Sequence, residues 1–147
     1  MTIIRTMTID DYDAVIKLLT ATQGVSLRDA DSREATARYL NRNPGLSFVA
    51  ADKSQPSELI GCLMSGHDGR RGYLQHLAVL PPCRRQGVAR SLMDHCLSAL
   101  AQLGIIKSHV DVFTDNELGR SFWASQGWEL RSDIVRFSYV VGGNAHA

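Results

Sequence analysis

The segment from Tyr73 to Ala89 combines residue types that suit the binding of a phosphate group. Strand-forming residues are followed by two prolines and a short basic loop, and the loop leads through Gly87 into a helical pattern. The first turn of a helix leaves its backbone N–H groups without partners, and a glycine lets an anion approach them closely. We therefore predict that this loop and helix start bind a phosphate group, and we call them the cradle. The alternative is an ordinary strand-to-helix connection whose arginines are solvated. The loop residues are Arg84, Arg85, Gln86 and Gly87.

Other ligand-binding motifs do not occur in the sequence. The loop lacks the Gly-Lys-Ser/Thr ending of a Walker loop, and there is no GxGxxG pattern. The three cysteines are an odd number without CxxC spacing, which argues against both a disulfide framework and a cysteine zinc site. We expect Cys62, Cys83 and Cys96 to be reduced, and we expect no metal.

The elements around the cradle alternate between strands and helices. The helix after the loop, from Gly87 to Leu103, has the clearest apolar period, and Gly104 suits its end. Strand patterns on either side of it are bounded by turn residues. The predicted ranges are 3–5, 9–24, 35–40, 46–51, 59–65, 73–80, 87–103, 105–114, 116–126, 128–131 and 134–141, with the last two ranges forming a final hairpin.

This order of hairpins and crossover helices predicts an α/β fold with a mixed central sheet covered by helices on both faces. A chain of 147 residues, 44% of them hydrophobic, can bury one core without disulfide or metal staples. We expect residues 1–141 to form a single domain and residues 142–147 to form a flexible tail.

Charge and hydropathy exclude several kinds of partner. Sixteen Lys and Arg residues balance fifteen Asp and Glu residues, so the formal net charge is +1 and no bulk field attracts nucleic acid or anionic lipid. The longest apolar run, Leu59 to Met64, is too short to span a bilayer, and the first residues lack the pattern of a signal peptide. We therefore expect a cytoplasmic protein with neither a nucleic acid nor a membrane as partner.

Two segments, in order, resemble the GNAT superfamily of acyl-CoA-dependent N-acetyltransferases. The run Arg84–Ala89 matches the family's phosphate motif of Gln or Arg, two residues, Gly, one residue, and Gly or Ala, and the strand and helix around it match as well. The run Asn116–Trp128 resembles the family's asparagine-led helix that ends in glycine and an aromatic residue. The resemblance covers nearly the whole chain. It implies a single-domain fold with a splayed pair of parallel strands, 73–80 and 105–114.

The resemblance also implies acetyl-CoA as the cosubstrate. Backbone N–H groups of the matched loop and helix start would hold the CoA pyrophosphate, which the helix dipole also favours. The strand end before the loop would pair with the pantetheine arm, and one of its N–H groups would polarise the thioester carbonyl. Asn116 would bind the arm from the opposite side. The implied contacts are Leu77, Ala78, Val79, Arg84, Arg85, Gln86, Gly87, Val88, Ala89, Arg90 and Asn116.

A free lysine-type amine has a pKa of about 10.4, so it is protonated at neutral pH. Transfer to such an amine therefore needs a base that removes the proton. Asp111 matches a position where some family members carry a glutamate that removes this proton; a solvated surface acid is the alternative reading. Strand alternation predicts His109 on the same face, as a second candidate. Gln75 and Tyr73 match positions that hold catalytic groups in other members. His76 should point to the opposite face as a packed or hydrogen-bonded histidine.

The sequence departs from the family pattern at Trp123, where many relatives have a tyrosine that protonates the departing thiolate. An indole cannot lose its proton, but a thiolate is a tolerable leaving group near neutral pH. The resemblance thus implies direct acetyl transfer to a primary amine of a small molecule or a protein N-terminus, with Trp123 beside the cofactor. A catalytically silent acetyl-CoA sensor or interaction module is the alternative. The edge of the predicted final hairpin makes a homodimer plausible.

Overall fold

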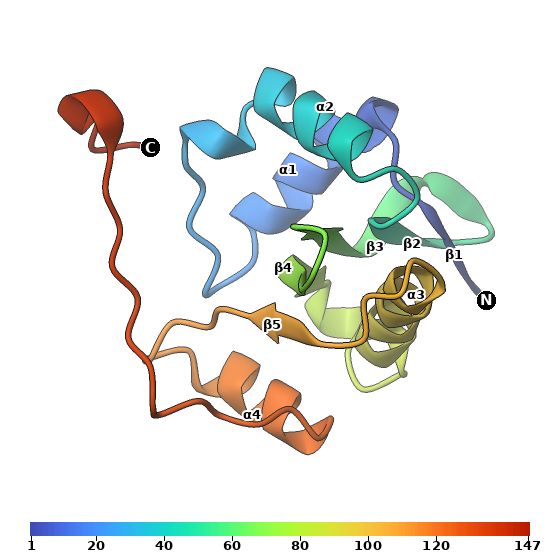
Figure 1. The fold of residues 1–147 in the computed structure, drawn as a ribbon. Coiled ribbons are helices and arrows are strands. Elements are labelled where there is room, and N and C mark those ends of the chain that lie inside the picture. The colour runs from blue at the N-terminus through green and yellow to red at the C-terminus, as the bar shows by residue number, and fades with distance from the viewer.

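The computed structural model describes residues 1–147 and contains one five-stranded sheet in the order β1-β2-β3-β4-β5 (Figure 1). The first four strands form an antiparallel meander, and β5 lies parallel to β4. The sheet is therefore mixed, as the sequence predicts. The strands are β1 (Thr2–Thr6), β2 (Phe48–Asp52), β3 (Gln55–His67), β4 (Gly72–Val79) and β5 (Ser108–Val110).

Helices cover both faces of the sheet, which confirms the predicted layers. On one face α1 packs over β2, β3 and β4, with α2 beside it; α3 packs on the other face. α4 follows β5 and lies beyond the open end of the sheet (Figure 1). The helices are α1 (Tyr12–Thr20), α2 (Arg33–Arg42), α3 (Val88–Gln102) and α4 (Glu117–Ser125); short 3₁₀ turns occupy Ile9–Asp11, Asp29–Asp31, Pro81–Cys83 and Val141–Gly143.

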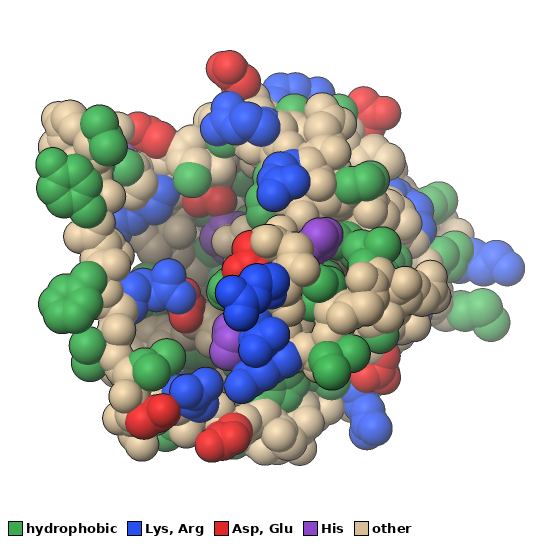
Figure 2. Space-filling model, in the orientation of Figure 1, with side chains coloured by type: hydrophobic (Ala, Val, Ile, Leu, Met, Phe, Trp, Pro, Cys, Tyr) green, Lys and Arg blue, Asp and Glu red, His purple; other side chains and the backbone are tan.

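The residues after α4 leave the body of the protein as one extended segment. Residues 129–140 contain no helix or strand and run from the end of α4 past β5 toward α2, with a hollow between them and the rest of the molecule (Figure 2). The far end is held at Asp29 by two hydrogen bonds. Asn144 Nδ2 donates to the Asp29 carboxylate at 2.8 Å, and the Asp29 N–H donates to the His146 carbonyl at 2.8 Å. We refer to residues 129–141 as the C-terminal arm.

Two predicted strand regions differ from the structure. The strand predicted over 105–114 is reduced to Ser108–Val110, and the final hairpin predicted over 128–131 and 134–141 does not form. Both predictions rest on β-forming residue patterns, but a strand also needs a hydrogen-bonding neighbour. β5 loses β4 as its neighbour after Val110, and no backbone group from Glu129 to Tyr139 makes a hydrogen bond within the chain.

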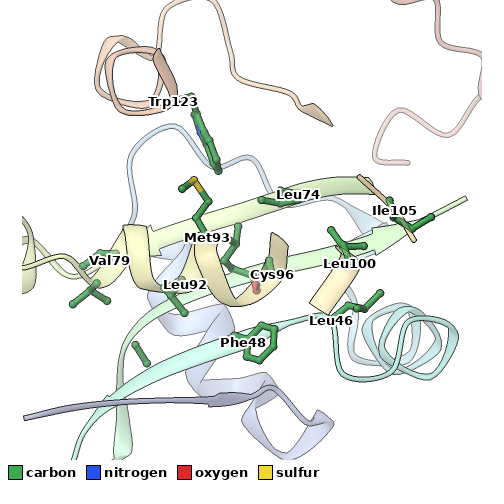
Figure 3. Close-up of a cluster of buried hydrophobic side chains, with 13 residues drawn as sticks. Leu46, Phe48, Leu74, Val79, Leu92, Met93, Cys96, Leu100, Ile105 and Trp123 are labelled. Carbon is green, nitrogen blue, oxygen red and sulfur yellow. Dashed lines mark hydrogen bonds between the residues drawn. The ribbon is translucent and has the colours of Figure 1, made fainter. Parts of the chain in front are cut away.

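The core is divided between the two faces of the sheet. The α3 side is built around Leu92, Cys96 and Leu100, which are fully buried and recur at the helical period of four residues (Figure 3). On the α1 side, Leu19 packs with Val49 and other strand residues. Cys62 and Cys96 are buried, Cys83 is half-buried, and none forms a disulfide, as predicted. No helix has the length and apolar character needed to cross a membrane.

An arginine–aspartate pair fixes the start of α1 against the sheet. Arg5 donates two hydrogen bonds to the Asp11 carboxylate at 2.8 and 2.7 Å, and the Thr8 N–H donates a third at 2.9 Å. Burial raises the pKa of Asp11, but the hydrogen bonds from Arg5 and Thr8 outweigh it, so the pKa lies below its usual value. The ionised carboxylate therefore stabilises the fold.

We expect Asp11→Asn to lower the free energy of unfolding at pH 7 by about 1–2 kcal/mol, because it removes a charge-assisted pair. A depressed folded-state pKa contributes stability above the unfolded value, near 3.9, and loses it as pH falls through the folded-state value. The difference from wild type should therefore shrink below about pH 4. Urea unfolding at both pH values measures it, with the exposed Asp10→Asn as control; a difference that persists unchanged in acid would contradict this account.

Candidate active site

A β-bulge in β4 opens the sheet where the site lies. Cys62 of β3 pairs with Ala78 and Met64 pairs with Gln75, so two residues of β4 oppose one of β3. One of these two, His76, has a φ of 59°, in the left-handed region. β4 and β5 pair only as far as Leu74 and Val110, and β4 then continues to Val79 with β3 as its one neighbouring strand. The predicted splayed parallel pair is therefore present, and the bulge marks where it opens.

The bulge also changes where His76 points. Strand alternation predicted the face opposite Gln75, and this is wrong, because the extra residue turns His76 toward the α1 side. There its Nε2 lies 2.6 Å from an Asp31 carboxylate oxygen, and both side chains are largely buried. The expectation of a hydrogen-bonded histidine is confirmed. Tyr12 donates to the Asp31 carbonyl at 2.6 Å, so this contact fastens the α1–α2 connection over the bulge.

The end of β4 presents a backbone edge with no strand beside it. Ala78 and Val79 pair with Cys62 and Gly61 of β3 on one side, and β5 has already diverged on the other. The Ala78 and Val79 side chains are buried, which holds this edge in place. Arg84 donates from Nε to the Val79 carbonyl at 3.0 Å and so ties the loop to the strand end.

The cradle is predicted at the loop and helix start after β4, and their backbone N–H groups are unpaired. None of the six backbone N–H groups from Arg85 to Arg90 donates a hydrogen bond within the protein. Gly87, with a φ of 81°, is the N-cap of α3, and nothing lies within 4 Å of where its β-carbon would stand. The Val88 side chain is buried and anchors the turn. A row of unpaired donors at the N-terminus of a fifteen-residue helix is a site for an anion.

The side chains around the cradle leave its N–H groups accessible. Gln86 bends back to donate to the Pro82 carbonyl at 3.2 Å, while Arg90 points along α3 with its Nε 4.0 Å from Asp94. Arg85 also has a positive φ, 61°, and is exposed. Ala89, half-buried, adds little bulk. The cradle thus combines backbone donors with the exposed guanidinium groups of Arg85 and Arg90 nearby.

Polar side chains line the opposite end of the opening. Tyr73 and His109 are direct partners across β4 and β5, with ring centroids 5.8 Å apart. The Tyr73 hydroxyl donates to Asp68 at 3.3 Å. Gln75, on the same face as Tyr73, is exposed. The structure therefore brings Tyr73, Gln75 and His109 together on one face, as strand alternation predicts.

Tyr39 of α2 also belongs to this face, and sequence reasoning missed it. Its hydroxyl is buried and makes no hydrogen bond of normal geometry, although Gln75 lies near it. Burial raises the pKa of Tyr39 to about 12 and outweighs the opposing effect of Gln75. Tyr39 is therefore a neutral hydroxyl group. The sequence shows it only as an apolar position of a weak helical pattern, so nothing there distinguished it from a core residue.

Asp111 lies just past the end of β5. Its side chain is 74% exposed, and one carboxylate oxygen is 2.7 Å from Nη2 of Arg136 in the C-terminal arm. Nothing in the sequence pattern points to this partner, which is 25 residues away along the chain. Any ammonium group that approaches Asp111 must therefore compete with Arg136 for the carboxylate.

Asn116 both caps α4 and reaches the α1–α2 connection. Its Oδ1 accepts from the Gly119 N–H at 3.0 Å. A β-carbon at Gly24 would lie 2.5 Å from Asn116 Nδ2, so Gly24, with a φ of 88°, permits the close approach. The Asn116 amide nitrogen donates to no protein group. It remains available at the open side of the sheet.

Trp123 packs beneath the site. It is 7% exposed and points from α4 toward Met93 of α3 (Figure 3). Its ring meets Phe122 and Trp128 edge-on, with centroids 5.1 and 4.7 Å away. The indole is thus a packing element that joins α4 to the core. No group of three or more His, Cys, Asp or Glu side chains is arranged to hold a metal ion.

Comparison with known proteins agrees with this fold. Residues 12–128 match the model of the acetyltransferase (GNAT) family, which places the chain in that family. The chain is therefore an N-acetyltransferase whose cosubstrate is acetyl-CoA. A protein of Pectobacterium atrosepticum described as an acetyltransferase is 35% identical over 115 residues, which are 78% of each chain.

Two solved structures share the fold at low sequence identity. The PaiA N-acetyltransferase of Thermoplasma acidophilum, in complex with coenzyme A, has a TM-score of 0.76 and 19% identity; the match covers 89% of this chain and 91% of that chain. AAC(6')-Iy in complex with the bisubstrate analogue CoA-S-monomethyl-acetylneamine has a TM-score of 0.72 and 18% identity over 95% and 99% of the two chains.

Gly87→Glu should abolish CoA binding, because the new carboxylate would occupy the anion site and a side chain at positive φ would distort the loop. Gly104→Glu is the matched control. Gly104 also has a positive φ, 82°, with open space around it, but it follows the opposite end of α3. Each change should cost about 1–3 kcal/mol of stability from backbone strain. Calorimetric titration of the folded variants with CoA measures binding; equal affinities would disprove the cradle.

Proposed function

We propose that the protein transfers an acetyl group directly from acetyl-CoA to a primary amine. The observation that carries this proposal is the row of six unpaired N–H groups from Arg85 to Arg90, next to the unpaired edge of β4. The CoA pyrophosphate would lie on those N–H groups, with Arg84 and Gln86 holding the loop. The pantetheine arm would run along Leu77–Val79.

The opening between β4 and β5 then holds the thioester. A backbone N–H of Leu77, Ala78 or Val79 would donate to the thioester carbonyl and stabilise the oxyanion that forms on attack. Asn116 would donate from its amide nitrogen to the arm on the other side. Trp123 would flank the thiol end of the arm; since an indole is not an acid, the thiolate would leave as such and take its proton from water.

Asp111 is the proposed base. An amine must lose its proton before it attacks, and a carboxylate next to the opening can accept that proton directly or through water. The ion pair between Arg136 and Asp111 would have to open for this step. Both side chains are highly exposed, so opening the pair costs little free energy. Gln75 and Tyr73 would position the amine or a water molecule, since neither is a base at neutral pH. His109 is the alternative proton acceptor.

Direct transfer is proposed over a covalent acetyl-cysteine intermediate because of where the cysteines lie. Burial raises the pKa of Cys62 and of Cys96 to about 12, so neither is a thiolate at neutral pH. Cys83 is half-buried in the turn after β4, on the pyrophosphate side of the opening. None of the three sulfurs is therefore suited to attack the thioester.

The acceptor is proposed to be an amine-bearing small molecule or a protein N-terminus. The fold likeness to AAC(6')-Iy, which was solved with a CoA-linked acetylneamine, supports a small-molecule acceptor without identifying one. We also propose a cytoplasmic homodimer in which residues 1–141 form a single N-acetyltransferase domain. The family match over residues 12–128 supports the domain, and three unpaired cysteines suit a reducing compartment.

If Asp111 is the base, Asp111→Asn should lower kcat by roughly 10²–10⁴-fold and leave CoA affinity unchanged. Asp115→Asn, an exposed acid four residues away, should have no effect on kcat. Turnover with a panel of primary amines and CoA titration measure the two quantities. An unchanged kcat for Asp111→Asn would move the role to His109 or to water held by Gln75.

Direct transfer predicts that both substrates bind before either product leaves. Initial rates measured over a grid of acetyl-CoA and amine concentrations should give intersecting double-reciprocal lines, whereas a covalent intermediate gives parallel lines. Cys83→Ser should keep near-normal activity. Parallel lines, or acetylated Cys83 trapped in the absence of amine, would disprove direct transfer.

A further inference from the structure

Among the buried side-chain nitrogen and oxygen atoms, only the hydroxyl of Tyr39 lacks a hydrogen-bond partner. Its ring packs on the α1-side core, and burial raises the pKa of the hydroxyl to about 12, so it stays a neutral hydrogen-bond donor. Leaving such a group unpaired costs free energy, whereas a phenylalanine would fill the same space without that cost. An unpaired buried hydroxyl therefore calls for an explanation, and a bound ligand is one.

Two neighbours hold the hydroxyl in this place. Asn43, which follows α2, donates from Nδ2 to the Tyr39 carbonyl at 3.2 Å and accepts from the His67 N–H at 3.2 Å, so the last turn of α2 is fixed to β3. Gly66 of β3 leaves room, because a β-carbon there would lie 2.9 Å from the hydroxyl oxygen. A glycine inside a strand also costs stability. The chain thus gives up stability at two positions, and both keep the hydroxyl where it is.

The hydroxyl lies beside Gln75, on the face of the sheet that carries the other polar side chains of the opening. Gly66 pairs with Tyr73, and Met64 pairs with Gln75. Side chains two residues apart on a strand share a face, so Tyr39, over Gly66, lies on the face of Tyr73 and Gln75. Gln75 is exposed and directly precedes the bulge that opens the sheet. Tyr39, whose hydroxyl is buried, therefore acts on a bound molecule through Gln75.

Building on the proposed function, we propose that Tyr39 positions the Gln75 carboxamide for the acceptor, and that the acceptor carries a hydroxyl or an amide close to its primary amine. When such an amine binds, the Tyr39 hydroxyl bonds to one half of the carboxamide, and the other half faces the opening. A neutral carboxamide held by a neutral hydroxyl pairs with another neutral polar group. It offers no hydrogen bond to an alkyl chain and no charge to balance a carboxylate.

A purely structural hydroxyl would be paired within the protein, as that of Tyr12 is. Tyr12 donates to the Asp31 carbonyl at 2.6 Å. The two tyrosines therefore predict different changes in stability: Tyr12→Phe should lower the urea midpoint of unfolding, whereas Tyr39→Phe should leave it unchanged or raise it. Tyr139→Phe, at a tyrosine that is 90% exposed, is the control and should change neither stability nor acetyl transfer.

The main test compares Tyr39→Phe with wild type on 2-aminoethanol, glycinamide and n-propylamine, in which a methyl group replaces the hydroxyl of 2-aminoethanol. Tyr39→Phe should raise KM for the two polar amines by about 3- to 10-fold, the value of one hydrogen bond, and leave kcat and the KM for n-propylamine unchanged. Comparing each amine between the two proteins cancels differences in amine basicity. The polar amine with the larger change shows whether the acceptor resembles an amino alcohol or the N-terminus of a peptide.

Gln75→Met tests whether the two residues act as a unit. It keeps the length of the side chain and removes the carboxamide, so KM for the polar amines should rise at least as much as in Tyr39→Phe. The double variant should bind them no more weakly than Gln75→Met alone, because Tyr39 acts only through Gln75. Additive losses would overturn the inference. So would an equal effect of Tyr39→Phe on all three amines, including none, or a Tyr39→Phe protein less stable than wild type.

Binding separates the inference from the proposed function. If wild type acetylates no amine, the proposed function fails, and CoA-saturated protein still decides the role of Tyr39. The NMR signal of the Gln75 side-chain NH2 group should shift saturably with 2-aminoethanol or glycinamide, and the shift should need an about 3- to 10-fold higher concentration in Tyr39→Phe. A Gln75 signal that neither amine shifts in wild type would overturn the inference.

Discussion

The single feature on which the site depends is the extra residue in β4 at His76. By placing two residues of β4 against one of β3, it turns the strand away from β5 just after Leu74. The opening and the unpaired edge at Leu77–Val79 both follow from that turn. A positive φ at a non-glycine residue costs free energy, and the His76–Asp31 contact at 2.6 Å, together with the buried side chains of Ala78 and Val79, stabilises it.

The bulge also connects the two halves of the site. On the α1 side it holds Asp31, and with it the α1–α2 connection that closes over Asn116 through Gly24. On the other side it directs β4 into the loop at Arg84, whose Nε fixes the Val79 carbonyl. The α1–α2 connection and the loop at Arg84 are therefore both positioned by one irregularity in one strand.

The sequence predicted the strand, loop and helix around the cradle correctly because their signal is local: a strand, two prolines, a basic loop, glycine and a strongly periodic helix are contiguous. It predicted the mixed sheet and the layers for the same reason, since hairpins and crossovers follow from element order. It was wrong on His76, because alternation assumes a regular strand and a bulge depends on packing. The partners Asp31 of His76 and Arg136 of Asp111, 45 and 25 residues away, are set by tertiary structure and leave no mark in the sequence.

The two mistaken strand boundaries have a common physical origin. Residues 105–114 and 134–141 carry side chains that favour extended backbone, but strand propensity reports fitness for a paired, half-buried surface rather than an intrinsic conformation. In one chain the bulge removes β4 from β5, and the fixed ends of the arm keep it at a distance from the β5 edge. Both segments therefore combine side chains that suit a paired strand with backbone groups that have no pairing partner.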